Sequence, residues 1–207
     1  MKIGIIGTGR MGSKLGELWG EYHQVMFGSR HPQKAKGLAQ SLKNNNLNGG
    51  SISDAVAFGD VVLLSTPWTA ALETVQNAGS FAGKILIDCT NPFGADSGVA
   101  VGHTTSGAEE IAKVATGAKV VKAFNSIYWE NLECPQFGPQ NASSFYCGDD
   151  AEAKKVVAQL TTELGFDPVD SGPLVNARYL EPLAMLWIHL AFAGGQGKDI
   201  AFKLLRR

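Results

Sequence analysis

The sequence has little that would favour a nucleic-acid-binding, secreted or membrane-spanning protein. Its 207 residues carry 18 basic and 19 acidic side chains, so no general positive field attracts nucleic acid or anionic lipid. Its three cysteines, Cys89, Cys134 and Cys147, have no C-x-x-C spacing, which argues against a disulfide framework and against a zinc site. The most apolar helix-like run, residues 182–193, is too short to cross a bilayer. We therefore expect a cytoplasmic protein with no signal peptide, no membrane segment, no metal and no nucleic-acid partner.

Residues suited to acid–base catalysis are also scarce. The four histidines are His23, His31, His103 and His189, and none of them is expected at the end of a strand. His189 lies on an apolar helix-like run, which is typical of a histidine packed in a core. No Ser/His/Asp order stands out, so we name no catalytic residue and expect chemistry that needs no strong protein acid or base.

A glycine motif at the N-terminus is the most informative feature that is present. Residues 7–12 read G-x-G-x-x-G, directly after a β-branched apolar run and before a helix-compatible stretch at residues 13–22. In this context Gly7 and Gly9 allow a tight turn and the close approach of a pyrophosphate, while Gly12 lets helix and strand pack. The free N–H groups of the helix then face the phosphates. The motif predicts a dinucleotide site that includes Gly7, Thr8, Gly9, Arg10, Met11 and Gly12.

The second predicted strand lacks the acidic residue with which NAD-binding proteins hold the ribose 2′-hydroxyl. The run at residues 25–28 ends in Ser29 and Arg30, and Lys34 follows one helical turn later. A guanidinium–phosphate hydrogen bond contributes about 1.5–3 kcal/mol, so two or three such contacts would favour a 2′-phosphate by about a hundredfold or more. We therefore expect NADP(H) as the cofactor.

Alternating strand and helix signals continue along the chain. We expect strands near residues 51–53, 60–65, 84–88 and 119–124, and helices at 32–42, 54–58 and 69–78, with Ser53 as the cap of the second helix. Such alternation implies right-handed crossovers and a doubly wound parallel sheet with ligands at the carboxyl ends of its strands. The fold class is therefore α/β, with an NADP-binding Rossmann domain over residues 1–140.

A small strand and helix extension is expected over residues 141–207. Strands are predicted at 143–147 and 168–170, with a helix at 150–164 that ends at Gly165. In a long helix at 177–193 the apolar positions crowd around much of the surface, which fits either burial in the subunit or a homodimer interface. Arg178 and Glu181 on this helix are expected to form a surface ion pair. The extension would complete an acceptor pocket and supply dimer contacts.

Several segments together resemble one family along almost the whole chain. They are residues 7–12, 28–30 with Lys34, 65–68, 147–150, 154–157, 170–174 and 177–181. The chain resembles the NADPH-dependent reductases of coenzyme F-420, a deazaflavin, and more distantly the cytosolic reductase domains of the STEAP metalloreductases. The resemblance implies that Thr8, Arg10 and Met11 lie along the pyrophosphate and that Ser29, Arg30 and Lys34 hold the 2′-phosphate. The remaining cofactor contacts that we expect are Ser65, Thr66, Pro67, Asn91, Pro92 and Asn125.

The acceptor is left open by the sequence. Archaeal deazaflavin reductases tend to carry a histidine after strand six, whereas this chain has Phe124-Asn125-Ser126-Ile127. The segments at residues 88–92 and 122–125 resemble the STEAP domains, which handle ordinary flavin. We expect coenzyme F-420 or a flavin to bind beside the nicotinamide, in a pocket with Trp68, Phe93, Ile127 and Ile200 in its wall.

The expected function is hydride transfer between NADPH and this acceptor, because two stacked rings with water excluded need no acid or base. An imine reductase similar to pyrroline-5-carboxylate reductase is an alternative, although that family needs a longer helical C-terminal domain. A third hypothesis is a sensor protein that binds NADPH without turning it over.

Overall fold

The computed structural model describes residues 1–94 and 104–207, so His103 lies outside the described part. The strands are β1 (Lys2–Ile6), β2 (Gln24–Ser29), β3 (Leu47–Ser51), β4 (Val61–Leu64), β5 (Ile85–Asp88), β6 (Lys119–Ala123), β7 (Gln136–Phe137), β8 (Gln140–Asn141), β9 (Ser143–Gly148) and β10 (Asp167–Asp170). The α-helices are α1 (Arg10–Trp19), α2 (Pro32–Ser41), α3 (Ile52–Phe58), α4 (Trp68–Asn77), α5 (Gly107–Val114), α6 (Ala151–Glu163) and α7 (Ala177–Ile188). Short 3-10 turns lie at Trp129–Leu132 and Leu174–Asn176, and a π-helix at His189–Ala193 extends α7.

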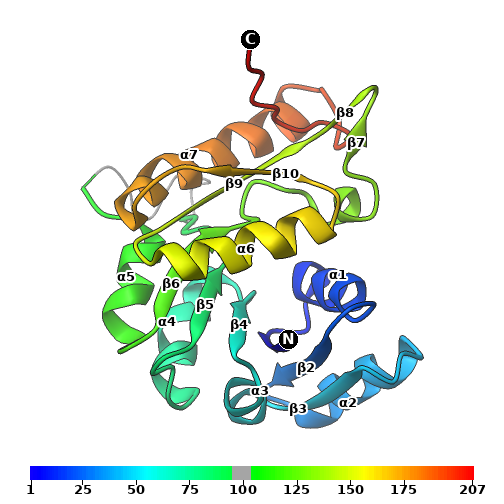
Figure 1. Ribbon diagram of the computed structural model, residues 1–207, viewed down its shortest axis with the longest axis vertical. Coiled ribbons are helices and arrows are strands. Elements are labelled where there is room, and N and C mark those ends of the chain that lie inside the picture. The colour runs from blue at the N-terminus through cyan, green and yellow to red at the C-terminus, as the bar shows by residue number, and fades with distance from the viewer. Residues whose placement is uncertain (95–103) are drawn as a thin grey trace.

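The main sheet has eight strands in the order β10-β9-β6-β5-β4-β1-β2-β3. Figure 1 shows it running from β9 and β10 near the top of the molecule to β3 at the bottom. Strands β1 to β6 are parallel, as expected, and the order changes direction between β1 and β4. Strand β9, which belongs to the predicted extension, runs antiparallel to β6. No crossover helix separates these two strands; the β7–β8 hairpin lies between them and returns the chain at the same end of the sheet.

The core has two layers, one on each face of the sheet. Alternate residues of a strand point to opposite faces. Ile5 belongs to a buried cluster that includes residues of α1, α2 and α6, whereas Ile6 belongs to a second cluster with residues of α3, α4, α5 and α7. Both isoleucines are fully buried. Covering both faces in this way explains why β1 and β4 are almost continuously apolar.

Among the described α-helices, a side-chain cap fixes the start of α3, α5 and α6. Helix α6 begins after Asp150, whose carboxylate accepts from the Ala153 N–H at 2.8 Å, and it ends before Gly165 at φ +83°, as predicted. The predicted strand at 51–53 is wrong, because β3 ends at Ser51 and that residue, not Ser53, caps α3 in a capping box with Asp54. Helix α5 was not predicted, although Ser106 caps it and the Glu109 N–H bonds to its hydroxyl.

Helix α7 buries one face and exposes the other. Leu180, Ala184 and Trp187 are buried, whereas Tyr179 is 73% exposed and Leu186 48%. The α-helix stops at Ile188, and the following π-helix carries His189 on its exposed side. The interpretation of His189 as a core residue is therefore wrong.

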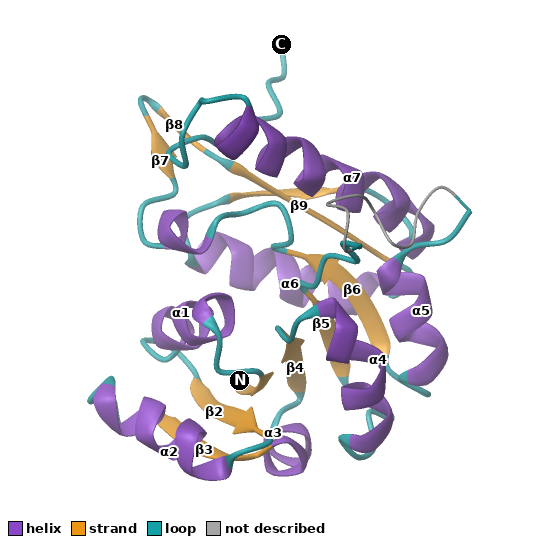
Figure 2. Cartoon of the chain, turned by 180° about the vertical axis from the view of Figure 1, so that it is seen from behind, coloured by secondary structure: helices purple, strands orange, loops and turns teal. Residues whose placement is uncertain are grey.

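The C-terminal tail lies against the start of β9 and projects beyond α7 (Figures 1 and 2). The Ser143 N–H donates to the Phe202 carbonyl at 2.9 Å, and the indole N–H of Trp187 donates to the Ile200 carbonyl at 2.9 Å. Of the helices in the described ranges, none combines the length and the apolar character that crossing a membrane requires.

Candidate functional site: a dinucleotide cavity at the strand ends

The glycine motif forms a tight turn between β1 and α1. Gly7 has φ +117°, a conformation that strongly favours glycine, and its N–H donates to the Gly28 carbonyl of β2 at 3.0 Å. A Cβ at Gly12 would lie 2.3 Å from the Ser65 hydroxyl, whereas a Cβ at Gly9 would meet nothing within 4 Å. Gly12 is thus a packing position, and Gly9 borders open space in front of a helix with no side-chain cap and no acidic residue in its first turn.

A cavity of about 260 Å³ opens in front of this turn, at the carboxyl ends of β1, β2 and β4. Nine of the predicted cofactor residues line it: Gly7, Thr8, Gly9, Ser29, Arg30, Lys34, Ser65, Thr66 and Pro67. Within the described ranges, no carboxylate lines it, so Arg30 and Lys34 leave its β2 side positive. An extra phosphate is the group that such a surface attracts.

His31 and four further residues in this lining were not predicted. The sequence interpretation placed no histidine at a strand end, but His31 lies two residues beyond β2, and its N–H donates to the Ser29 hydroxyl at 3.1 Å. The signal was its position beside Arg30. The other residues without a prediction are Gly28, Ile52, Ala70 and Thr74, of which Ile52 opens α3 and could have been found only with the correct end of β3.

The end of β4 is fixed from β1. The Ser65 hydroxyl and N–H both donate to the Ile6 carbonyl, at 3.0 and 2.9 Å. The next side chain, Thr66, has a buried hydroxyl with no partner in the described structure. Pro67 then caps α4. An unpaired buried hydroxyl is costly, so Thr66 is a position where a bound polar group would supply the missing hydrogen bond.

The predicted residues at β5 and β6 lie beside the cavity rather than in its lining. Asn91 and Asn125 bond each other: the Asn91 amide donates to the Asn125 carbonyl at 2.9 Å, and the Asn125 amide donates to Asn91 Oδ1 at 3.1 Å. Phe124, just before, has φ +65°, which is an unusual conformation for a bulky residue. Pro92 is not in the lining either. Arg10, Met11 and Gly12 belong to α1 and also do not line the cavity.

The four predicted acceptor residues do not share one cavity among the described residues. Trp68 and Pro92 both approach Gly107, where a Cβ would lie 3.2 Å and 3.3 Å from them. Ile127 and Ile200 line a small separate cavity of about 10 Å³ with the tail. Phe93, half-buried, forms an isolated bridge just before residues 95–103.

A buried charged cluster behind the strand ends was missed by the sequence analysis. Lys122 on β6 lies 3.0 Å from Asp88 Oδ2 on β5 and 2.9 Å from Glu181 Oε1 on α7. The expected surface pair of Arg178 and Glu181 is therefore wrong, since Arg178 bonds Glu109 instead. Burial alone would lower the pKa of Lys122, but the two carboxylates outweigh it and hold that pKa above its ordinary value. The available signal was a lysine within the apolar run at residues 120–123.

A group of three aromatic side chains, Tyr128, Trp129 and Trp187, was also not predicted from the sequence. Tyr128 stacks on Trp187 with ring centroids 5.4 Å apart. Lys198 of the tail lies 5.3 Å from the Tyr128 ring, and Arg10 lies 5.5 Å from the Trp129 ring. Both contacts have cation–π geometry, and they bring the tail and the first residue of α1 to neighbouring aromatic rings.

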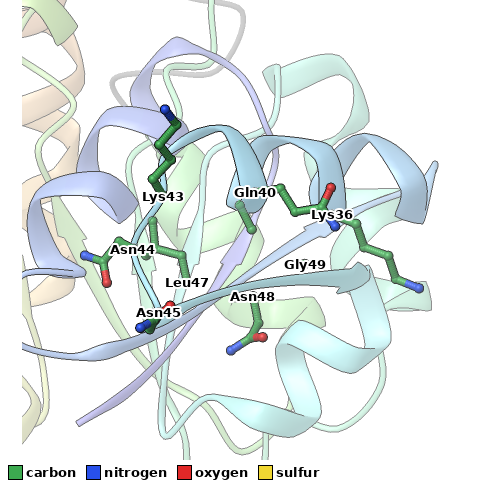
Figure 3. Close-up of a pocket in the computed structure, with 9 residues that line it drawn as sticks. Lys36, Gln40, Lys43, Asn44, Asn45, Leu47, Asn48 and Gly49 are labelled. Atoms are coloured by element: carbon green, nitrogen blue, oxygen red, sulfur yellow. The ribbon is translucent and has the colours of Figure 1, made fainter.

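A larger, open hollow of about 670 Å³ lies away from the strand ends, between α2 and the start of β3. Figure 3 shows its amide and lysine side chains, among them Lys36, Lys43 and Asn48. Within the described part of the chain, it contains none of the buried polar groups that lack a partner. We therefore place the candidate site at the strand ends and not here.

The fold and the cavity define an NAD(P)-binding α/β protein of the Rossmann type. Against solved structures, the chain superposes on one from Arthrobacter sp. FB24, named provisionally as an F420-dependent NADP reductase, with a TM-score of 0.90, 31% identity and 100% of both chains covered. A reductive aminase from Aspergillus terreus, solved with NADPH4, superposes with a TM-score of 0.68 at 22% identity. The superposition covers 93% of this chain and 62% of the aminase chain. The second likeness shows the fold alone.

Comparison with characterised sequences narrows this class to one family. Residues 2–92 match the model of the family described as NADP oxidoreductase, coenzyme F420-dependent. The F420-dependent NADP reductase of Methanocaldococcus jannaschii is 32% identical over 92% of both chains. Metalloreductase STEAP3 of Rattus norvegicus is 34% identical over 89% of this chain, which spans only 37% of that protein. The chain belongs to the F420-dependent NADP oxidoreductase family.

Proposed function

We propose that this protein transfers a hydride between NADP(H) and a flavin-like acceptor, either coenzyme F-420 or a flavin. The observation that carries the proposal is the cavity of about 260 Å³ at the strand ends, with Arg30 and Lys34 on its β2 side, in a chain of this reductase family. The positive side fits an extra phosphate on the adenosine ribose, and this is the feature that separates NADP from NAD.

The residues present fit the dinucleotide. The open space at Gly9 admits a pyrophosphate against the first turn of α1, and Thr8, Arg10 and Met11 follow along it. Ser29, Arg30 and Lys34 would bind the 2′-phosphate. The unpaired hydroxyl of Thr66, with Ser65 and Pro67 beside it, would face the nicotinamide ribose. When bound, NADPH supplies the hydride from its nicotinamide ring.

The acceptor side is proposed to orient a flat ring and exclude water from it. Pro92 and Asn125, with Trp68, Phe93, Ile127 and Ile200, are the residues that we propose for this role. Residues 1–140 would bind the dinucleotide and residues 141–207 would complete the acceptor side and form a homodimer. No catalytic acid or base is included, because hydride transfer between stacked rings depends on orientation and dryness. A cytoplasmic location is part of the proposal, since free thiols such as the buried Cys89 and Cys147 are typical of a reducing compartment.

The NADP preference is tested by the change Arg30→Ala. We expect KM for NADPH to rise by about tenfold or more, because a charge-assisted hydrogen bond is lost, while KM for NADH stays within about twofold. Lys36→Ala is the matched control, since Lys36 is an exposed cation on the same helix outside the cavity. Equal losses for NADPH and NADH would contradict the proposed 2′-phosphate contact.

The acceptor is tested by mixing the protein and NADPH separately with F-420, FMN, FAD and a cyclic imine, while nicotinamide absorbance is followed. Rapid oxidation with one of the first three supports the proposal and identifies the acceptor. Turnover of the imine alone would replace the proposal with an imine reductase. Micromolar NADPH binding without turnover of any acceptor would indicate a sensor.

A further inference from the structure

The buried cluster of Lys122, Asp88 and Glu181 joins three elements directly behind the proposed nicotinamide position. All three side chains are at most 1% exposed. The ammonium of Lys122 makes three contacts: Asp88 Oδ2 at 3.0 Å, Glu181 Oε1 at 2.9 Å and the Thr90 carbonyl at 2.6 Å. A lysine ammonium has three donors, so every donor of Lys122 is used.

The charges of the cluster are balanced by the start of α5. Glu181 also accepts the N–H groups of Gly107 at 2.9 Å and Ala108 at 3.1 Å. These belong to the first turn of α5, where free N–H groups favour an anion. One ammonium and one helix N-terminus thus compensate two carboxylates, and Glu181 fixes α5 to α7. Figure 2 shows α5 beside one end of α7.

A contribution to folding stability does not by itself explain why these three charged side chains are buried together. Burying three ions carries a large desolvation cost, and well-packed apolar side chains of similar volume are often as stable or more so. What the ions provide, and apolar side chains do not, is a directional bond to a particular main-chain atom. Here that atom is the carbonyl of Thr90, the residue before Asn91.

The two strand-end loops are attached to neighbouring residues of α7, Leu180 and Glu181. The loop after β5 is held by Lys122, which Glu181 positions. The loop after β6 is held by Asn125, whose amide donates to the Leu180 carbonyl at 2.9 Å and to Asn91 Oδ1 at 3.1 Å. Leu180 and Glu181 therefore fix the loops that carry Asn91 and Asn125.

We infer that Lys122 and Glu181 are positioning residues that hold the loops at residues 89–92 and 124–127 in place for the nicotinamide half of the dinucleotide. The inference rests on the proposed function. Neither side chain is a catalytic residue, because both are buried and neither lines the cavity at the strand ends. The adenosine half binds at the ends of β1 and β2, which this cluster does not touch.

The two halves of the cofactor allow a direct test by calorimetric titration with NADPH and with 2′,5′-ADP, which carries only the adenosine half and its 2′-phosphate. The informative variant is Asp88→Asn combined with Lys122→Met. It removes one charge of each sign and keeps an oxygen that accepts the bonds from Thr90. It also leaves intact the hydrogen bonds that Glu181 accepts from the first turn of α5. We expect Kd for NADPH to rise by about tenfold or more, with Kd for 2′,5′-ADP unchanged within about twofold.

A second variant, Glu181→Gln, covers the case in which the double variant does not fold. Its expected effect has the same direction, and in turnover kcat should fall more than KM for NADPH rises. Arg178→Gln is the control for a loosened α7, since it breaks the bond between α7 and Glu109 without touching the loops, and it should leave both dissociation constants unchanged.

The outcomes separate the two proposals. An unchanged NADPH to 2′,5′-ADP affinity ratio in folded variants would overturn the positioning role and leave the proposed function intact. A ratio that changes equally in Arg178→Gln would overturn it as well, because the effect would then be general loosening. Failure of the unmodified protein to bind 2′,5′-ADP would instead overturn the NADP site itself.

Discussion

Two glycines of one motif have different tasks in this chain. A Cβ on Gly12 would lie 2.3 Å from Ser65 Oγ and 2.8 Å from the Gly7 carbonyl, so Gly12→Ala must push α1 away from β4. We expect this change to lower the free energy of unfolding by about 1–3 kcal/mol and to weaken NADPH binding through the displaced turn. Chemical denaturation and titration with NADPH measure the two effects.

Gly9→Ala is the matched variant. Gly9 has φ −81° and open space at its Cβ position, so the added methyl should change stability by less than about 0.5 kcal/mol. It occupies the space that we assign to the pyrophosphate, and NADPH affinity should therefore still fall. Equal loss of stability in the two variants, or full NADPH affinity in Gly9→Ala, would contradict this division of roles.

Single residues were predictable where their role is local. Ser29, Arg30 and Lys34 lie within one turn of a strand end, so their joint position at the cavity follows from short-range geometry. The partners of Glu181 and Arg178 were not predictable in this way. Spacing of three residues suggested a pair on one helix face, but burial of Glu181 beside Lys122, 59 positions earlier, depends on how α7 packs.

The same contrast holds for helices and strands. Helix α6 could be bounded from Asp150 and Gly165 because capping is a local bond. Helix α5 begins with a Ser-x-x-Glu capping pattern at Ser106, and the sequence analysis did not use this signal. The direction of β9 had no local signal, because residues 143–148 are equally strand-like in either direction and the intervening hairpin decides it.

The tail is the element whose attachment to the rest of the molecule can be tested most simply. The Lys198, Ile200 and Phe202 carbonyls accept hydrogen bonds from Asn131, Trp187 and Ser143. A chain that ends after Gly197 loses these three bonds, each of which contributes about 1 kcal/mol. We expect its free energy of unfolding to fall by about 2–4 kcal/mol, as measured by urea denaturation.

A chain that ends after Leu204 is the control for this truncation. It lacks only Leu205, Arg206 and Arg207, which are exposed, and its stability should match that of the full chain. Binding of 2′,5′-ADP should be unchanged in both, because the tail does not line the dinucleotide cavity. Equal stability of the two shortened chains would show that the tail bonds contribute nothing.

At the scale of the whole molecule, the doubly wound fold was predictable and the acceptor side was not. Alternating strands and helices with right-handed crossovers leave few strand orders, and the observed order of β1 to β6 is one of them. The proposed acceptor residues come from α4, from the segments after β5 and β6, and from the tail. Whether Trp68, Ile127 and Ile200 approach one another depends on the packing of distant segments, which no local pattern records.

The exposed apolar face of α7 and of the π-helix that follows it predicts how two copies of the chain would assemble. Tyr179 is 73% exposed, Leu186 48% and Phe192 57%, and apolar side chains gathered on one face are typical of an interface. We expect a homodimer in solution. Tyr179→Glu combined with Leu186→Glu should convert it to a monomer, since two charges would be buried without partners, and light scattering after gel filtration measures the mass directly.

Tyr22→Glu provides the control, because Tyr22 is 67% exposed but follows α1 rather than lying on α7. This variant should remain dimeric. The paired variant should keep the affinity of the unmodified protein for 2′,5′-ADP, because the cavity at the strand ends is lined by no residue of α7. A monomeric unmodified protein, or a dimer that survives both charges on α7, would show that this face does not join two copies.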